Sequence, residues 1–214
     1  MSDRVPLVVY GAGGHGKVVA EAALQSGRFD VLGFLDDDAV HHTWCGLPIL
    51  GGRGALFTLE RSVEIALGIG TNADRAQAGL GILAAERSLA TVVHPTASIA
   101  SRVSLGAGTY VGPLAVVHAD ASTGRGCIVN SGAIVEHDCV LGDWVHVSPR
   151  AALGGGVRLG EGVHAGLGAL VLPGLHLGPW TRVGAGAVVT ASLPPGVTAV
   201  GIPARVREIV EVEQ

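Results

Sequence analysis

Residues 95–130 read PTASIA SRVSLG AGTYVG PLAVVH ADASTG RGCIVN, and the pattern continues over 131–190 as SGAIVE HDCVLG DWVHVS PRAALG GGVRLG EGVHAG LGALVL PGLHLG PWTRVG AGAVVT. The fifth place of each hexad is apolar everywhere except at Thr123, the third place is usually small or apolar, and glycine dominates the sixth. Two inward places per six residues are typical of short strands joined by tight corners, whereas plain strand alternation and helical periodicity do not pause in this way. Glycine suits such corners because it tolerates positive φ and leaves room for neighbouring backbone. The stretch predicts an all-β parallel solenoid.

The composition around this stretch describes an ordered protein. The 214 residues include 34 glycines, only 15% are charged, and the mean hydropathy is +0.47, which is unlike a disordered chain. A net charge of -4 offers no electrostatic footprint for nucleic acid or an anionic membrane. The three cysteines lack a CxxC spacing, and neither a secretion signal nor a membrane-spanning run is evident. We therefore expect a cytoplasmic protein.

The segment before the repeat has the pattern of a small α/β unit. A strand over 5–10 is followed by GAGGHG at 11–16 and a helical pattern, and the next strand, VLGFLDDD, ends in Asp36 to Asp38. A glycine turn between a strand and a helix is the usual cradle for phosphate. Only 94 residues precede the repeat, about half of a dinucleotide fold, so a mononucleotide or nucleotide sugar is the expected ligand. We predict a Rossmann-like nucleotide-sugar-binding domain at 1–94 and a second domain, with a C-terminal tail, at 95–214.

The hexads resemble those of the hexapeptide-repeat acyltransferases. This resemblance implies a left-handed parallel β-helix of triangular section with 18-residue coils, assembled as a homotrimer with active sites between subunits. The whole chain is similar to the nucleotide-sugar N-acetyltransferases of the sialic-acid-O-acetyltransferase-like family, through GAGGHGKVV, FLDDD, GIGTN, HPTASI, VNSGAIVEHDCVLGDWVHVSPRAALGGGV and VGIPAR. Membership implies acetyl-CoA as the donor, a UDP- or GDP-linked 4-amino-4,6-dideoxy sugar as the acceptor, a place in bacterial surface glycan synthesis, and no metal.

Acyl transfer needs a base for the incoming nucleophile and a donor for the oxyanion. His137 begins a hexad, outside the inward places, so it should face outward at a corner, and Asp138 beside it can orient the imidazole. One 18-residue coil further on lies Gly155, whose N–H is the expected oxyanion donor because no side chain blocks the approach. The family resemblance implies the same three catalytic residues.

The resemblance also implies the binding residues. The acetyl-CoA contacts are expected at His146, Leu167, Gly184, Ala185 and Arg205. The nucleotide-sugar contacts are expected at Gly13, Gly14, His15, Asp36 and Asn130. Residues 18 apart should stack, which places His146 over His164 and His118 over Glu136.

Three other functions remain open. O-acetylation of sialic acid or another sugar hydroxyl would use the same base. A γ-type carbonic anhydrase would use the same fold with zinc on histidines such as His137, His146 and His164, although it leaves the N-terminal unit unexplained. A non-enzymatic nucleotide sensor or scaffold with a degenerate β-helix is the third alternative.

Overall fold

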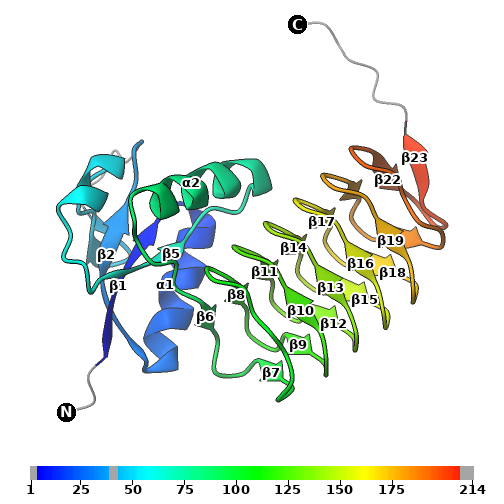
Figure 1. Ribbon diagram of the computed structural model, residues 1–214, viewed down its shortest axis with the longest axis horizontal. Coiled ribbons are helices and arrows are strands. Elements are labelled where there is room, and N and C mark those ends of the chain that lie inside the picture. Colours follow the sequence, from blue (N-terminus) through cyan, green and yellow to red (C-terminus); the bar gives the residue numbers. More distant parts are fainter. Residues whose placement is uncertain (1–3, 39–42, 208–214) are drawn as a thin grey trace, which may run out of the picture.

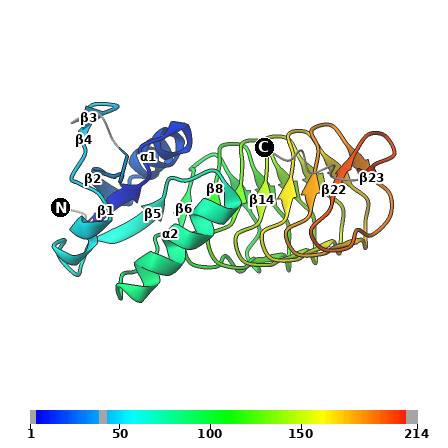
Figure 2. The ribbon, with the colours of Figure 1, turned by 90° about the horizontal axis from the view of Figure 1, so that it is seen from above.

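The computed structural model describes residues 4–38 and 43–207. The chain forms an α/β unit at one end of a long stack of coils, and it climbs the stack from one end to the other (Figure 1). Helix α2 lies along the first coils, on the side from which Figure 2 is viewed. Within the described ranges, no helix is long and apolar enough to cross a membrane.

The N-terminal unit is a three-stranded parallel sheet with the order β2-β1-β5. Its elements are β1 (Val5–Tyr10), α1 (Gly14–Ser26), β2 (Phe29–Leu35), β3 (Thr43–Trp44), β4 (Leu47–Pro48), a 3-10 helix at Arg53–Phe57, β5 (Glu64–Leu67) and α2 (Asn72–Ala84). The strand over 5–10 has its predicted bounds. Helix α1 begins at Gly14, within the glycine stretch, so that His15 and Gly16 belong to its first turn.

The repeat forms a prism with three parallel β-faces. The first face contains β6 (Val92–Val93), β8 (Tyr110–Val111), β11 (Ile128–Val129), β14 (His146–Val147), β17 (His164–Ala165), β20 (Arg182–Val183) and β22 (Thr198–Val200). The second face contains β7 (Ser98–Ile99), β9 (Val116–Val117), β12 (Ile134–Val135), β15 (Ala152–Leu153), β18 (Leu170–Val171) and β21 (Val188–Val189). The third face contains β10 (Ser122–Thr123), β13 (Val140–Leu141), β16 (Arg158–Leu159) and β19 (His176–Leu177).

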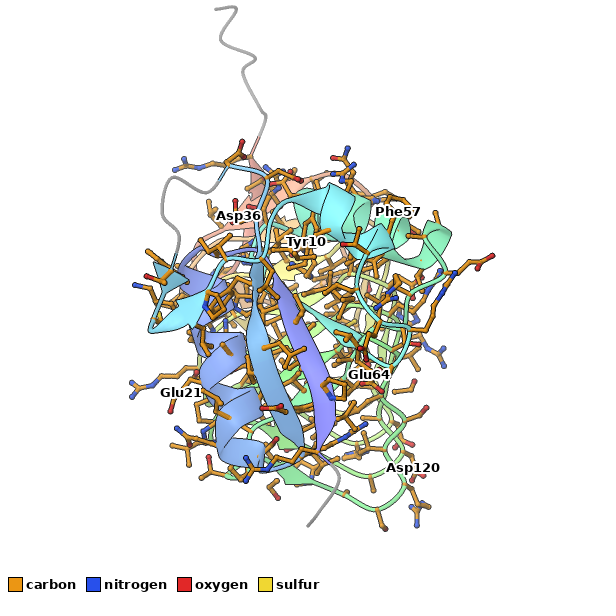
Figure 3. All side chains as sticks on the ribbon, turned by 90° about the vertical axis from the view of Figure 1, so that its left-hand side faces the viewer. Tyr10, Glu21, Asp36, Phe57, Glu64 and Asp120 are labelled. Atoms are coloured by element: carbon orange, nitrogen blue, oxygen red, sulfur yellow. The ribbon has the colours of Figure 1, made fainter. Side chains whose placement is uncertain are left out.

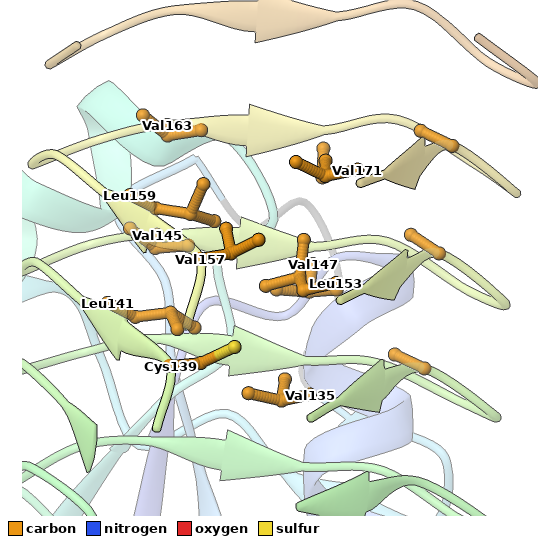
Figure 4. Close-up of a cluster of buried hydrophobic side chains, with 14 of the residues drawn as sticks. Val135, Cys139, Leu141, Val145, Val147, Leu153, Val157, Leu159, Val163 and Val171 are labelled. Atoms are coloured by element: carbon orange, nitrogen blue, oxygen red, sulfur yellow. The ribbon is translucent and has the colours of Figure 1, made fainter. Parts of the chain in front are cut away.

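Neighbouring strands on each face pair residues that are 18 apart, such as His146 with His164. The third and fifth hexad places point into the prism, where valine, leucine, alanine and cysteine side chains form one core (Figure 4). The polar Thr123 is accommodated because its hydroxyl accepts a hydrogen bond from the Gly106 N–H at 3.0 Å and lies 3.2 Å from Thr109 Oγ1. The structure therefore has the predicted hexad pattern and the predicted coil of 18 residues.

The glycines at the corners have two separate roles. Positive φ occurs at the second hexad place, where Gly156 has a φ of 70° but Trp144 and Arg150 also adopt 61° and 59°. The sixth-place glycines do not have positive φ; at Gly142, an added Cβ would lie 2.8 Å from the backbone nitrogen of Glu161 in the next coil. The prediction that glycine provides both properties at a corner holds, but at different places of the hexad.

Two features bound the prism. Its first face begins at β6, just before His94, and the boundary at 94/95 stays a prediction. At the other end, β23 (Arg205–Arg207) turns back and pairs antiparallel with β22. The residues after 207, the end of the predicted tail, lie outside the described part.

Candidate active site

The chain crosses between faces at three corners, which we number in chain order. The first corner lies between the first and second faces and includes Asn130, the second lies between the second and third faces and includes His137, and the third lies between the third and first faces and includes Trp144. Each corner repeats every 18 residues, so residues with the same role in successive coils form a column.

The three predicted catalytic residues gather at the second corner. His137 Nδ1 lies 2.7 Å from Asp138 Oδ2, and this hydrogen bond is the main cause of a raised His137 pKa. The imidazole is 62% exposed, so it is accessible to a substrate. Gly155 lies beneath it in the next coil, because an added Cβ on Gly155 would lie only 2.6 Å from His137 Nε2. The stacking inferred from the 18-residue spacing is therefore observed.

The backbone of Gly155 leaves a donor free at this corner. The flanking Gly156 N–H donates to the His137 carbonyl at 2.9 Å, and the Gly155 carbonyl accepts from the Gly174 N–H at 2.9 Å. Within the described part of the chain, the Gly155 N–H itself has no acceptor. A free N–H beside an unencumbered imidazole nitrogen is the pair of groups that acyl transfer requires.

The first face carries a second group of polar residues. The rings of His146 and His164 stack with centroids 4.9 Å apart, as the spacing predicted. His146 Nε2 lies 3.2 Å from Asn130 Nδ2, and His164 Nε2 lies 2.8 Å from Ser148 Oγ. Burial is the main cause that lowers the His146 pKa to about 2, with His164 and Arg75 adding to it. His146 is therefore a neutral hydrogen-bonding group at physiological pH.

A cleft of about 590 Å³ opens beside these histidines, and the beginning of α2 forms its other wall. Its lining residues are Gly70, Thr71, Asn72, Ala73, His146, Gly162, His164, Trp180 and Arg182. The α/β unit thus contributes directly to the space next to His146.

Asp36 lies at the carboxyl end of β2, as predicted. One of its carboxylate oxygens accepts the Ala12 N–H at 2.6 Å, and the other accepts the Asp38 N–H at 2.9 Å. Tyr10 lies at the same end of the sheet (Figure 3) and donates its hydroxyl to Asp37 at 2.6 Å. These residues, with Arg53 from the 3-10 helix, line a cleft of about 340 Å³. Carboxyl ends of parallel strands are the usual position for a nucleotide.

The glycine stretch divides into an open part and a buried part. Gly13 and Gly14 are exposed, and an added Cβ on either would meet no atom within 4 Å. His15 turns toward the prism, where its ring packs edge-on against Tyr110 at 5.2 Å, and its Nε2 has no partner in the described structure. Burial, followed by the charge of Arg75, lowers the His15 pKa to about 4.

The predicted cofactor residues follow the first corner toward the end of the prism. Leu167 is 59% exposed there, and Gly184 and Ala185 occupy the corner one coil further on. Arg205 is exposed on β23. Its Nη1 donates a hydrogen bond to the carbonyl of the preceding residue, Ala204, at 2.9 Å. Within one chain these residues and His146 stand apart from His137, because a full face of the prism separates the first corner from the second.

Sequence reasoning missed Arg75, which is 1% exposed and joins α2 to the prism. Its Nε donates to the Gly126 carbonyl at 2.8 Å, and its Nη2 donates to the Trp144 carbonyl at 2.7 Å. A signal was present in the sequence: Arg75 falls on the same side of α2 as Gly79 and Ile82, the apolar stripe of that helix. A cation on an apolar stripe indicates a buried polar contact.

The histidines proposed for zinc are distributed over two sites. His137 lies at the second corner, whereas His146 and His164 lie on the first face. Among the described residues, no group of three or more His, Cys, Asp or Glu side chains could hold a metal ion.

The comparisons with known proteins cover both halves of the chain. A profile of the PglD N-terminal domain matches residues 6–78. The acetyltransferase domain of PglB from Neisseria gonorrhoeae, solved alone and with acetyl coenzyme A, is 37% identical over 95% of this chain and 100% of its own, with a TM-score of 0.92. GDP-perosamine N-acetyltransferase from Caulobacter crescentus, solved as a histidine-to-alanine mutant with CoA and GDP-perosamine, is 38% identical over 95% of this chain and 97% of its own, with a TM-score of 0.91.

The chain belongs to this family of sugar N-acetyltransferases. It is an acyltransferase, and the predicted order of a Rossmann-like unit followed by a left-handed parallel β-helix is confirmed. Another match, WeeI from Acinetobacter baumannii, is 28% identical over 94% of this chain and 99% of its own, with a TM-score of 0.86. A search of the curated proteins found no match.

Proposed function

We propose that the protein transfers the acetyl group of acetyl-CoA to the amino group of a nucleotide-linked 4-amino-4,6-dideoxy sugar, with His137 as the general base. One observation carries this proposal: the His137 imidazole, oriented by Asp138, stands beside the free N–H of Gly155 in a chain that matches sugar N-acetyltransferases along 95% of its length. Bacterial surface glycan synthesis is the process that such a product would serve.

The groups at the second corner support each step of an acyl transfer from a thioester to an amine. Asp138 accepts a hydrogen bond from the Nδ1–H of His137, which leaves Nε2 as the group that takes a proton from the attacking amine. As the new C–N bond forms, the Gly155 N–H stabilises the oxyanion, and Asp138 stabilises the imidazolium. The C–S bond then breaks, and His137 returns the proton to the leaving thiolate of CoA.

The donor would lie along the first corner. Leu167, Gly184 and Ala185 present exposed surface and backbone there, and Arg205 is a suitable partner for a CoA phosphate through charge-assisted hydrogen bonds. The neutral His146 would contact the acetyl end of the molecule.

The acceptor would be held mainly by the α/β unit. Among the described residues each Asp36 carboxylate oxygen accepts one backbone N–H, which leaves lone pairs for a ribose or base donor. The open Gly13 and Gly14 at the beginning of α1 would admit the diphosphate, since helix N-termini favour anions. His15 and Asn130 would contact the sugar between this unit and the prism.

A homotrimer would bring the separated groups together. From β9 to β21, the outward positions of the second face carry Val116, Ile134, Ala152, Leu170 and Val188 in one column, and Ile134 and Leu170 are 37% and 44% exposed. An uninterrupted apolar column on a flat face is typical of a subunit interface. Packing that face against a neighbour would place the second corner of one subunit close to the first corner of the next.

The first experiment measures thiol release from acetyl-CoA with UDP- and GDP-linked 4-amino sugars, and with sialic acid as the hydroxyl control. Turnover with one amino sugar is expected and names the nucleotide. Turnover with sialic acid alone would replace the proposal with O-acetylation. His137→Ala should lower kcat by about 10²- to 10⁴-fold, the usual contribution of a general base, while acetyl-CoA binding is retained. Unchanged turnover would remove His137 from this role.

A further inference from the structure

Helix α2 is hydrogen-bonded to three successive coils of the prism. Arg75 donates to the carbonyls of Gly126 and Trp144, and Asn72 Nδ2 donates to the Gly162 carbonyl at 2.9 Å. These three carbonyls belong to residues 18 apart, so they form one column at the third corner. Two side chains of one helix therefore bind equivalent positions of three coils.

The same two side chains hold the loop between β5 and α2. Arg75 Nη1 donates to the Gly70 carbonyl at 2.8 Å, and its Nη2 donates to Asn72 Oδ1 at 2.9 Å. Gly70 and Asn72 both line the cleft beside His146. The network thus fixes a loop of the α/β unit against the face that carries His146.

Packing makes this contact rigid. The Trp144 indole is buried and lies against Gly79 of α2 and Gly126 of the preceding coil, and a Cβ on either glycine would overlap the ring. Such close-packed contacts resist displacement. Helix α2 cannot shift along the prism without breaking both the packing and the hydrogen bonds.

The guanidinium of Arg75 is retained at an energetic disadvantage. In the described part of the chain its hydrogen-bond partners are carbonyl and amide oxygens, and no carboxylate neutralises it. Burying a cation without a counter-ion has a large desolvation penalty, and an apolar side chain would fill the same space without that penalty. A fork of five N–H donors, however, fixes geometry in a way that an apolar residue does not.

We propose that Arg75 and Asn72 are positioning residues that set the distance between the loops of the α/β unit that would bind the nucleotide and the first face of the prism, where His146 would contact the acetyl group. This proposal rests on the proposed function. A nucleotide sugar would be held by loops that follow β1, β2 and β5, while its amine must meet a thioester on the prism. The reacting distance therefore depends on how the two units are docked, and a displacement of about 1 Å can cost about 100-fold in rate.

The test compares Arg75→Lys with Arg87→Lys. Arg87 is also buried and donates to the carbonyls of Leu59, Glu60 and Val63, but these bonds stay within the α/β unit. Arg75→Lys should lower kcat for the nucleotide-linked amino sugar by about 10- to 100-fold. The Kd values for acetyl-CoA and for the free nucleoside diphosphate should be unchanged. Arg87→Lys should lower the Tm without lowering kcat.

Asn72→Ala is the second variant if Arg75→Lys does not fold, and it should show the same kcat loss. A free 4-amino-4,6-dideoxy sugar, which is not tethered to the α/β unit, should be acetylated at the wild-type rate by both Arg75→Lys and Asn72→Ala. Equal losses with tethered and free sugars, or an unchanged kcat, would overturn the positioning role. Absence of wild-type turnover with every amino sugar would instead overturn the proposed function, and the positioning role with it.

Discussion

Asp138 adopts a φ of 60°, in the left-handed region, directly after the histidine that it contacts. Outside glycine, asparagine and aspartate are the residues that tolerate this conformation best. A corner that needs a left-handed residue at this place can therefore also carry a carboxylate next to His137. Asp138 therefore serves both as the left-handed residue of the corner and as the carboxylate of the proposed catalytic pair.

Asp138→Asn should separate these two contributions, because asparagine keeps the left-handed backbone and removes the charge. The hydrogen bond to Asp138 raises the His137 pKa, and a general base must be neutral. Asparagine is a neutral acceptor and stabilises the imidazolium less than the carboxylate does, so the His137 pKa should fall. The acid limb of the kcat/KM profile should then move to lower pH while the plateau falls. The measurement is the pH dependence of kcat/KM for both proteins. An acid limb that stays in place would mean that another group titrates.

Gly155→Ala should lower activity far more than stability. The new Cβ would lie 2.6 Å from His137 Nε2 and Cε1, and the exposed imidazole would swing away to avoid it. We expect kcat/KM to fall by about 100-fold through misplacement of the base, with a change in unfolding free energy of about 0.5 kcal/mol. Kinetics and thermal unfolding of the same sample test this. A large loss of Tm would show that the glycine is needed for the fold instead.

At the scale of single elements, contacts decide as much as dihedral angles do whether a glycine can be replaced by a larger residue. Gly142 lies at a sixth hexad place, against the backbone of the next coil, whereas Gly81 in α2 has open space around it. The two residues therefore predict opposite effects of the same substitution.

Gly142→Ala should destabilise the protein by about 1 to 3 kcal/mol, the usual cost of overpacking. Gly81→Ala should stabilise it by about 0.5 to 1 kcal/mol, because alanine is the better helix former and meets no neighbour. The Tm values of both variants, measured at one protein concentration, check the prediction. Similar shifts for the two would contradict the contact argument.

The sequence predicted elements whose positions repeat and missed those that depend on distant contacts. A strict six-residue period specifies the prism core and places Gly155 beneath His137, because each coil repeats the last. No comparable rule relates α2 to the prism, since Arg75 and Gly126 are 51 residues apart in sequence and Asn72 and Gly162 are 90 apart. The short hairpin of β3 and β4 was also missed, as two-residue strands carry too little periodicity to recognise.

At the scale of the whole molecule, the three-sided section separates groups that act together in the proposed function. His137 lies at the second corner and His146 lies on the first face, and the apolar second face separates the second corner from the first. A shared site between subunits follows if each subunit supplies one of these histidines.

Mixing two inactive variants should therefore restore activity. The His137→Ala and His146→Ala proteins would be unfolded and refolded together in equal amounts. In the proposed homotrimer, some sites would then combine an intact His137 from one subunit with an intact His146 from its neighbour. About a quarter of the sites should be complete if subunits assort at random around a closed ring. Thiol release by the mixture is the measurement, with each variant refolded alone as the control. No recovery would mean that both histidines act within one subunit or that the site lies elsewhere.

The antiparallel pairing of β23 with β22 affects whether the protein can associate end to end with other chains. A column of in-register parallel rungs presents unpaired amide and carbonyl groups at its last rung, and such an edge is a template on which another chain can add. Since β23 runs in the opposite direction, it occupies those groups and ends the pattern on the first face. The protein can use a geometry close to that of a fibril while remaining a particle of finite length.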